Sequence, residues 1–292
     1  MRPGGRETRL AWALSAPALL TIGVFLAYPI AAAVLASLHH DTPFAERRFA
    51  GLDNYGELLE DDLLRESLVF TFLFVGTSVT LEVFSGLAIA LVLHESFRGR
   101  GLLRAAVLVP WAVPTVVTAV MWKYMASDQY GLLNLLLHGN EIANYDAFLA
   151  HQGSARLILV LADVWKTTSF AALLLLAGLQ AIPDELHEAA RIDGAWAWRR
   201  FWHVTLPLLR PAILLAVLFR TIDAFRVFDL VYVMTRGAPA GSTNVLSFHG
   251  YETMFPEQLF GYGSAVSVLV FLITATLAVL AVRAIGTKGL AR

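Results

Sequence analysis

Eight ionisable side chains interrupt stretches of the sequence that are otherwise strongly apolar. They are Glu82, Lys123, Asp163, Lys166, Arg220, Asp223, Arg226 and Asp229. A charge inside a membrane span is costly unless it is paired or hydrated, so each is a candidate for a polar path or a structural ion pair. Asp163 and Lys166 stand three residues apart and are predicted to pair on one helix. Lys123 is expected to snorkel to the interface, and Glu82 has no evident partner.

Four of these charges alternate in sign at steps of three residues, from Arg220 to Asp229. On a continuous helix each step turns the stripe by about 60°, and Ala224 and Val227 share the face of Asp223. Donors and acceptors beside a small residue suit a neutral polar ligand, because an anion would favour arginines without compensating acids. The alternative is that Arg220 and Asp223 only fasten this helix to a neighbour.

The densest charge lies in a polar unit at residues 183–207. Pro183 suits the first position of a helix, and the acids Asp184 and Glu188 follow near the helix start, where the helix dipole favours them. Gly194 is a natural helix end. These signals predict a short amphipathic helix.

A second short helix is predicted within the same unit and is expected to end at Pro207. Trp198, Phe201, Trp202 and Thr205 recur at helical spacing and share one face. A plain loop needs no aromatic face of this size, so we expect the unit to dock on another protein.

The composition places these residues in a membrane protein. Of 292 residues, 57% are hydrophobic and 15% are charged, whereas a soluble domain carries about 25% charge. Six apolar stretches reach the ~20 residues that a transmembrane helix needs; they cover about 11–38, 67–93, 102–126, 156–181, 209–234 and 262–283. The first is too long for the core of a cleaved signal peptide. The sequence thus predicts an all-α polytopic protein, with a cytoplasmic tail at 1–10 and one transmembrane domain at 11–292.

The basic residues predict the orientation, because lysines and arginines concentrate on the cytoplasmic side. Thirteen fall on one side: Arg2, Arg6, Arg9, Arg98, Arg100, Arg104, Arg191, Arg199, Arg200, Arg210, Arg283, Lys288 and Arg292. Five fall on the other: Arg47, Arg48, Arg65, Arg156 and Arg236. We therefore expect a multi-pass protein of the cytoplasmic membrane, with both termini and the 183–207 unit in the cytoplasm.

Several classes of chemistry are excluded. A Walker A loop needs Gly-Lys before its Ser or Thr, and the chain has no such dipeptide, so it is not predicted to hydrolyse ATP. His187-Glu188 begins a zinc-protease motif, but Arg191 stands where the second histidine belongs. There is no cysteine, and the net charge of −1 provides no attraction for nucleic acid. We expect no enzymatic activity, metal or cofactor on this chain.

The polar unit also resembles a known family signature. Glu188-Ala189-Ala190, Gly194 and Val204-x-Leu206-Pro207 look like the EAA loop of ABC importer permeases, with Val204 where that family usually has Ile. Residues 165–168, 176–180 and 225–229 resemble the carbohydrate-uptake branch, which includes the maltose and trehalose permeases. So does the segment 237–243, where Ala238 replaces a glycine.

The resemblance implies a type I ABC importer permease fold and a sugar, such as trehalose or maltose, as the substrate. It implies a second homologous permease, two ATPase subunits that hold ATP and Mg, and an extracytoplasmic sugar-binding lipoprotein. The EAA resemblance assigns ATPase coupling to Glu188, Ala189, Ala190, Asp193, Gly194, Trp198, Phe201, Trp202, Leu206 and Pro207. The substrate path is assigned to Lys166, Thr167, Arg220, Asp223, Ala224, Phe225, Arg226, Val227 and Asp229.

Other functions stay open at this point. A related permease could carry glycerol phosphate or a polyol. An ion-coupled secondary transporter could use Asp163 or Asp229, although such proteins usually show internal repeats. A membrane-embedded hydrolase would need a nucleophile beside an oriented base, and no such pair stands out.

Overall fold

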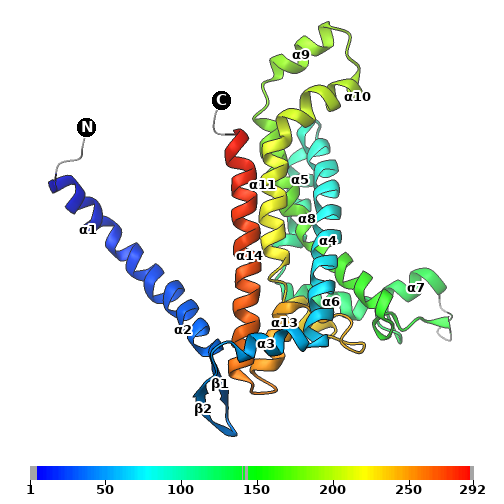
Figure 1. Cartoon of the computed structure of the whole chain (residues 1–292). Helices are drawn as coiled ribbons and strands as arrows, with labels where there is room; N and C mark the ends of the chain where they lie inside the picture. Colours follow the sequence, from blue (N-terminus) through cyan, green and yellow to red (C-terminus); the bar gives the residue numbers. More distant parts are fainter. Residues whose placement is uncertain (1–4, 140, 142–143, 290–292) are drawn as a thin grey trace. The chain divides into compact units, whose positions relative to one another are not determined.

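The computed structural model describes residues 5–139, 141 and 144–289, so residues 1–4 of the predicted tail and the last three residues lie outside the described chain. The chain forms two compact units, one of residues 1–61 and 249–272 and the other of residues 62–248 and 273–292. Helices dominate both (Figure 1).

The first unit begins with a long helical stretch. It comprises α1 (Gly5–Ile22), a π-helical turn η1 (Gly23–Ala27) and α2 (Tyr28–Ser37). A proline within a helix clashes with the carbonyl four residues before it. For Pro29 that carbonyl belongs to Phe25 in the π turn, whose wider spacing lets the helix continue. Residues Trp12–Ser37 are long and apolar enough to span a membrane.

A small hairpin follows, which the sequence did not predict. The strands β1 (His39–Thr42) and β2 (Ala45–Phe49) pair antiparallel, but their residues lack the alternation of apolar and polar types that marks a strand. Buried Asn54 in α3 (Asp53–Glu60) donates to the carbonyls of Ser37 (2.7 Å) and His39 (2.9 Å), which ties the hairpin to the helices on either side of it.

The second unit is built on three long helices. These are α4 (Asp62–His94), α8 (Gln152–Gln180) and α11 (Leu206–Ala224), which pack on one another (Figure 1). The connecting elements are α5 (Arg100–Ala112), α6 (Thr115–Met125), α7 (Leu132–His138), η3 (Phe148–Ala150), α9 (Asp184–Ile192), α10 (Ala197–Arg200), η4 (Phe201–Thr205) and α12 (Asp229–Met234). Two further helices, α13 (Leu246–Met254) and α14 (Phe260–Gly289), cross the boundary between the units.

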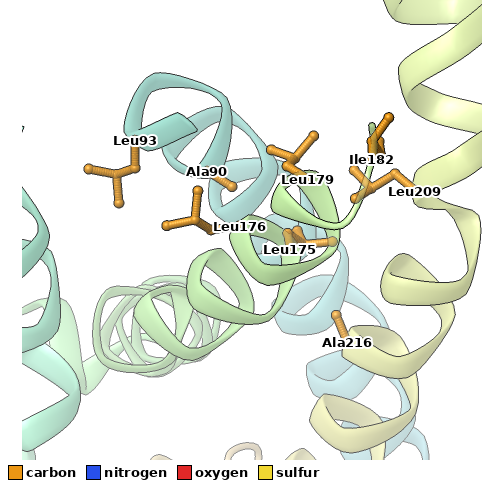
Figure 2. Close-up of a cluster of buried hydrophobic side chains, with 8 residues drawn as sticks. All are labelled: Ala90, Leu93, Leu175, Leu176, Leu179, Ile182, Leu209 and Ala216. Atoms are coloured by element: carbon orange, nitrogen blue, oxygen red, sulfur yellow. The ribbon is translucent and has the colours of Figure 1, made fainter. Parts of the chain in front are cut away.

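Apolar side chains fill the contact between these three helices. Figure 2 shows leucines of α8 facing Ala90 and Leu93 of α4, with Leu209 and Ala216 of α11 beside them. Glycine permits the close approach of α8 to α11, because a Cβ on Gly178 would lie 2.4 Å from the Cβ of Ala212.

Among the described residues, five helices could cross a membrane, or six if the bent pair of α5 and α6 is one span. The predicted third span at 102–126 is this pair, bent by 90° at Val113–Pro114, because Pro114 cannot continue a regular helix. The predicted fifth span at 209–234 is wrong as one continuous helix, since α11 ends at Ala224 and α12 begins at Asp229.

The second helix of the polar unit does not end at Pro207. It runs from Ala197 through η4 into α11, a continuous stretch of 28 residues to Ala224. The carbonyl that Pro207 would meet belongs to His203 in the π-helical η4, so the same device as at Pro29 accommodates the proline.

Candidate functional site

The break between α11 and α12 forms the first candidate site. Three consecutive amides close a tight turn, from Phe225 to Thr221 O (3.1 Å), from Arg226 to Asp223 O (3.0 Å) and from Val227 to Ala224 O (3.2 Å). Arg226 therefore lies in the turn, and the predicted helical stripe of four charges does not exist as such.

A cavity of about 170 Å³ opens at this break. Its lining comes from α6, α8, α11, the turn and α12, and consists of Thr115, Asp163, Lys166, Thr167, Asp223, Ala224, Arg226, Val227, Phe228 and Asp229. Seven of the nine residues predicted for the substrate path are among them. The other two are buried behind the cavity: Phe225 contacts Phe72 edge-on at 5.0 Å between ring centroids, and Arg220 has its own partners.

Arg220 joins three helices through ion pairs. Its guanidinium donates twice to Glu82 of α4, once through Nη2 at 3.0 Å and once through Nε. It also reaches Asp163 of α8 at 3.4 Å and the neighbouring Asp223 of α11. The side chains of Arg220 and Glu82 are 3% and 0% exposed, whereas that of Asp223 is 71% exposed. The sequence left Glu82 without a partner because its partner lies 138 residues away.

The predicted pair of Asp163 with Lys166 is wrong. Asp163 pairs with Arg220, and the ammonium of Lys166 donates to the carbonyl of Val113 at 2.5 Å. That carbonyl lies at the break between α5 and α6, where Pro114 interrupts the helix. Lys166 therefore provides a hydrogen-bond donor for a backbone carbonyl at the break while it lines the cavity.

The cavity also holds charges without an ion-pair partner. Arg226 and Asp229 are exposed, and neither has an oppositely charged side chain within 4 Å among the described residues. Three carboxylates and two cations line the cavity in total. Such a lining presents many donors and acceptors without a strong net charge, as a polar uncharged ligand requires.

Sequence reasoning missed Thr115 and Phe228 as lining residues. Thr115 reaches the cavity only because the bend at Pro114 redirects α6, and Phe228 does so only because α11 stops short. Pro114 marks the first break in the sequence, but no local pattern shows where the bend directs α6, and none marks the break between α11 and α12. Asp163 did stand out in the sequence, as a charge within an apolar stretch.

The second candidate site is α9 and the residues around it, at one end of α8 and α11 (Figure 1). Gly194 follows α9 with a φ of +76°, and its amide bonds to Arg191 O (3.0 Å) while that of Ala195 bonds to Ala190 O (2.9 Å). This is a Schellman cap, so the predicted helix end at Gly194 is confirmed. α9 buries no residue, and Ile192 is 87% exposed.

The predicted aromatic face is present beside α9. Trp198, Phe201 and Trp202 contact one another, with ring centroids 5.5–6.2 Å apart. Both tryptophans remain exposed, as does Trp196. An isolated soluble surface rarely leaves so much aromatic area uncovered. Glu188, Ala189 and Asp193 are likewise exposed, whereas Leu206 and Pro207 are partly buried within the helical stretch that leads into α11.

Comparison with known proteins identifies the family. Residues 82–288 match the family described as "Binding-protein-dependent transport system inner membrane component". The chain belongs to this family. It is 44% identical over 269 residues to the trehalose/maltose transport system permease protein MalF of Thermococcus litoralis, covering 92% of this chain and 90% of that one. It is 43% identical to the trehalose transport system permease protein SugA of Mycobacterium tuberculosis, covering 98% and 92%.

Solved structures agree on the fold. A chain of a bacterial ABC transporter involved in import of the acidic polysaccharide alginate superposes with a TM-score of 0.83 at 19% identity, over 97% of each chain. A second structure, of a bacterial alginate ABC transporter with its pentasaccharide-bound periplasmic protein, gives 0.82 at 20% identity over 94% of this chain and 93% of that one. The binding-protein-dependent permease therefore has the ABC importer permease fold, and it is a membrane transport component rather than an enzyme.

Proposed function

We propose that this permease imports a sugar across the cytoplasmic membrane, with trehalose or maltose as the first candidates. The relatives named for trehalose and maltose transport match nearly the full length of the chain at 43–44% identity. Family membership leaves no place for an ion-coupled secondary transporter or a hydrolase.

The lining of the cavity at the break between α11 and α12 carries the proposal. Sugar hydroxyls bind to planar polar groups, and Arg226 and Asp229 offer such groups without partners of their own. Asp223 adds an exposed carboxylate, and Phe228 adds a ring that can stack on a sugar face. Lys166 and Thr167 complete the polar wall.

A second candidate substrate comes from another relative. The sn-glycerol-3-phosphate permease protein UgpA of Agrobacterium fabrum is 32% identical over 92% of each chain. A phosphate ester would favour arginines without compensating acids, whereas three carboxylates face two cations in this cavity. The charge balance therefore favours a neutral sugar.

The energy for import comes from partners in this proposal. Two ATPase subunits hold ATP and Mg, a second permease completes the path, and an extracytoplasmic binding lipoprotein delivers the sugar. The exposed α9, with Glu188, Ala189, Ala190, Asp193 and Gly194, seats against an ATPase. The uncovered tryptophans beside it support this arrangement.

The excess of basic residues on the side of α9 supports an orientation with α9 and both termini in the cytoplasm. Cysteine labelling tests it directly, because the chain has no cysteine of its own. Asp53→Cys and Asp128→Cys should react with an impermeant thiol reagent added to intact cells. Arg98→Cys and Asp193→Cys should react only after the membrane is permeabilised, and the reverse pattern would contradict the orientation.

The substrate is tested by uptake of labelled compounds in a strain that lacks the permease gene. Complementation should restore uptake of trehalose or maltose and leave uptake of glycerol 3-phosphate unchanged. Restoration of glycerol 3-phosphate uptake alone would overturn the sugar assignment.

A further inference from the structure

A larger polar cavity lies beneath α9, away from the break between α11 and α12. Its volume is about 640 Å³, and its walls come from the end of α4, the start of α5, the end of α8, and α9, α10 and η4. It thus lies between the ends of long helices and the polar unit that joins α8 to α11. None of the residues assigned to the sugar path lines it.

Three guanidinium groups line this cavity without a counter-ion. Arg100, Arg191 and Arg200 come from α5, α9 and α10. Among the described residues, no carboxylate lies within 4 Å of any of them. The two acids of the lining, Glu95 and Asp184, are both exposed and make no ion pair there. The arginines therefore leave an excess of positive charge facing an open space.

Buried donors sharpen this observation. The Nε of Arg100 and the Nε of the adjacent Arg104 are both buried and make no hydrogen bond among the described residues. Buried donors of this kind normally have a partner; Arg104 does not line the cavity, but the Nε of Arg100 belongs to its lining and is open to a bound group or a water molecule. Burial lowers the pKa of His187 in the same lining, and the nearby Arg200 and His94 lower it further. The lowered pKa favours the neutral imidazole of His187, which adds no positive charge to that of the arginines.

We propose that this cavity binds the phosphate headgroup of an anionic phospholipid. Guanidinium groups bind phosphate oxygens through paired N–H donors. Basic pockets between the cytoplasmic ends of membrane helices are suited to lipid headgroups. The cavity lies at such helix ends, where α4, α8 and α11 leave their apolar stretches. The placement at the cytoplasmic leaflet rests on the orientation in the proposed function.

The position favours a lipid over free phosphate. The lining also contains half-buried apolar side chains, those of Leu91 and Phe201. A headgroup with acyl chains can use both the arginines and this apolar wall, whereas inorganic phosphate uses only the arginines. The site would thereby couple lipid binding to the base of α9.

The test measures lipids that stay bound to the assembled transporter in nanodiscs. The discs contain phosphatidylcholine with a minor share of phosphatidylglycerol. The transporter is then extracted into detergent that contains phosphatidylcholine, and mass spectrometry measures the phosphatidylglycerol that stays bound to it. We expect retained phosphatidylglycerol on the wild type and a loss of at least severalfold in Arg100→Gln/Arg200→Gln. Arg199→Gln is the matched control, because Arg199 is the exposed neighbour of Arg200 and does not line the cavity.

Three outcomes would overturn the proposal. Equal retention by the double variant and by the control would show that the arginines hold no lipid. Displacement of phosphatidylglycerol from the wild type by millimolar inorganic phosphate would identify a free-phosphate site. Free exchange of the retained phosphatidylglycerol for phosphatidylcholine on the wild type would also overturn the proposal. This outcome needs no variant, so it applies even if the double variant does not fold. Sugar uptake is measured separately, so that failure of lipid retention and failure of sugar import remain distinguishable.

Discussion

The two charged regions of the permease treat their charges in opposite ways. Around Arg220, one buried guanidinium meets three carboxylates from α4, α8 and α11, and the two innermost side chains are 3% and 0% exposed. Around α9, three arginines face a cavity and have no carboxylate within 4 Å of their guanidinium groups among the described residues, and the helix itself buries no residue.

The difference distinguishes charges that hold the helices together from charges that are available to other molecules. A buried charge must have its partners within the chain, since its desolvation is otherwise uncompensated. Exposed cations and uncovered aromatic rings find their partners outside the chain. The cluster around Arg220 therefore holds the helices in place, and the region around α9 is left to other molecules. The break between α11 and α12 combines both, because Asp223 is paired on one side and exposed on the other.

The largest effect is expected from breaking the buried cluster. Arg220→Gln would leave Glu82 and Asp163 together without a cation, at a cost of about 3–5 kcal/mol. We expect little folded protein at normal growth temperature, measured by thermal unfolding in detergent and by yield.

Glu82→Gln/Arg220→Gln is the partner experiment. Removing both charges of the bidentate pair should recover part of the lost stability, because Asp163 alone, and no longer Glu82 beside it, is then left without its cation. Normal stability of Arg220→Gln alone would contradict the architectural role. A swap of Arg220 with Asp223 is less informative, since it would place three carboxylates beside one another.

The next largest effect concerns coupling. Glu188→Lys reverses a charge on exposed α9 and should lower sugar-stimulated ATP hydrolysis by the assembled transporter about tenfold, without loss of stability. Glu60→Lys makes the same change in α3 and serves as the control. Unchanged stimulation in Glu188→Lys would remove α9 from the coupling surface and weaken the comparison.

A smaller effect is expected where α8 approaches α11. Gly178→Ala places a Cβ 2.4 Å from that of Ala212, and overpacking of this kind costs about 1–3 kcal/mol. Gly153→Ala lies in the same helix with nothing within 4 Å of the added Cβ and should be close to neutral. Equal unfolding temperatures for the two variants would show that α8 and α11 move apart to accommodate the added Cβ at little cost in stability.

The smallest effect is expected at the cavity itself. Asp229→Asn keeps the size and the acceptor of an exposed side chain, so stability should stay within about 0.5 kcal/mol. The KM for sugar uptake should rise severalfold, because one charge-assisted hydrogen bond to a hydroxyl is weakened. An unchanged KM would indicate that Asp229 lies beside the path and not on it.

The sequence predicted the main features for clear physical reasons. Apolar length identifies spans, and a glycine that needs a positive φ identifies the end of α9 at Gly194. What it could not predict were the turn between α11 and α12 and the distant pairs. The turn at residues 225–228 is set by packing against other elements, including a bond from Ser247 to the carbonyl of Val227. The pair of Glu82 with Arg220 joins helices far apart in sequence, and local spacing favoured Lys166 for Asp163 instead.

Protection of a single cysteine tests the sugar path most directly. Val227→Cys places the only thiol of the chain in the wall of the cavity, and Asp53→Cys places one at the exposed start of α3, outside the cavity. Both are labelled in intact cells with a small methanethiosulfonate reagent, with and without a sugar that the cells take up. The sugar should slow the labelling of Val227→Cys severalfold and leave that of Asp53→Cys unchanged. Equal labelling of Val227→Cys with and without transported sugar would contradict the assignment of this cavity to the path.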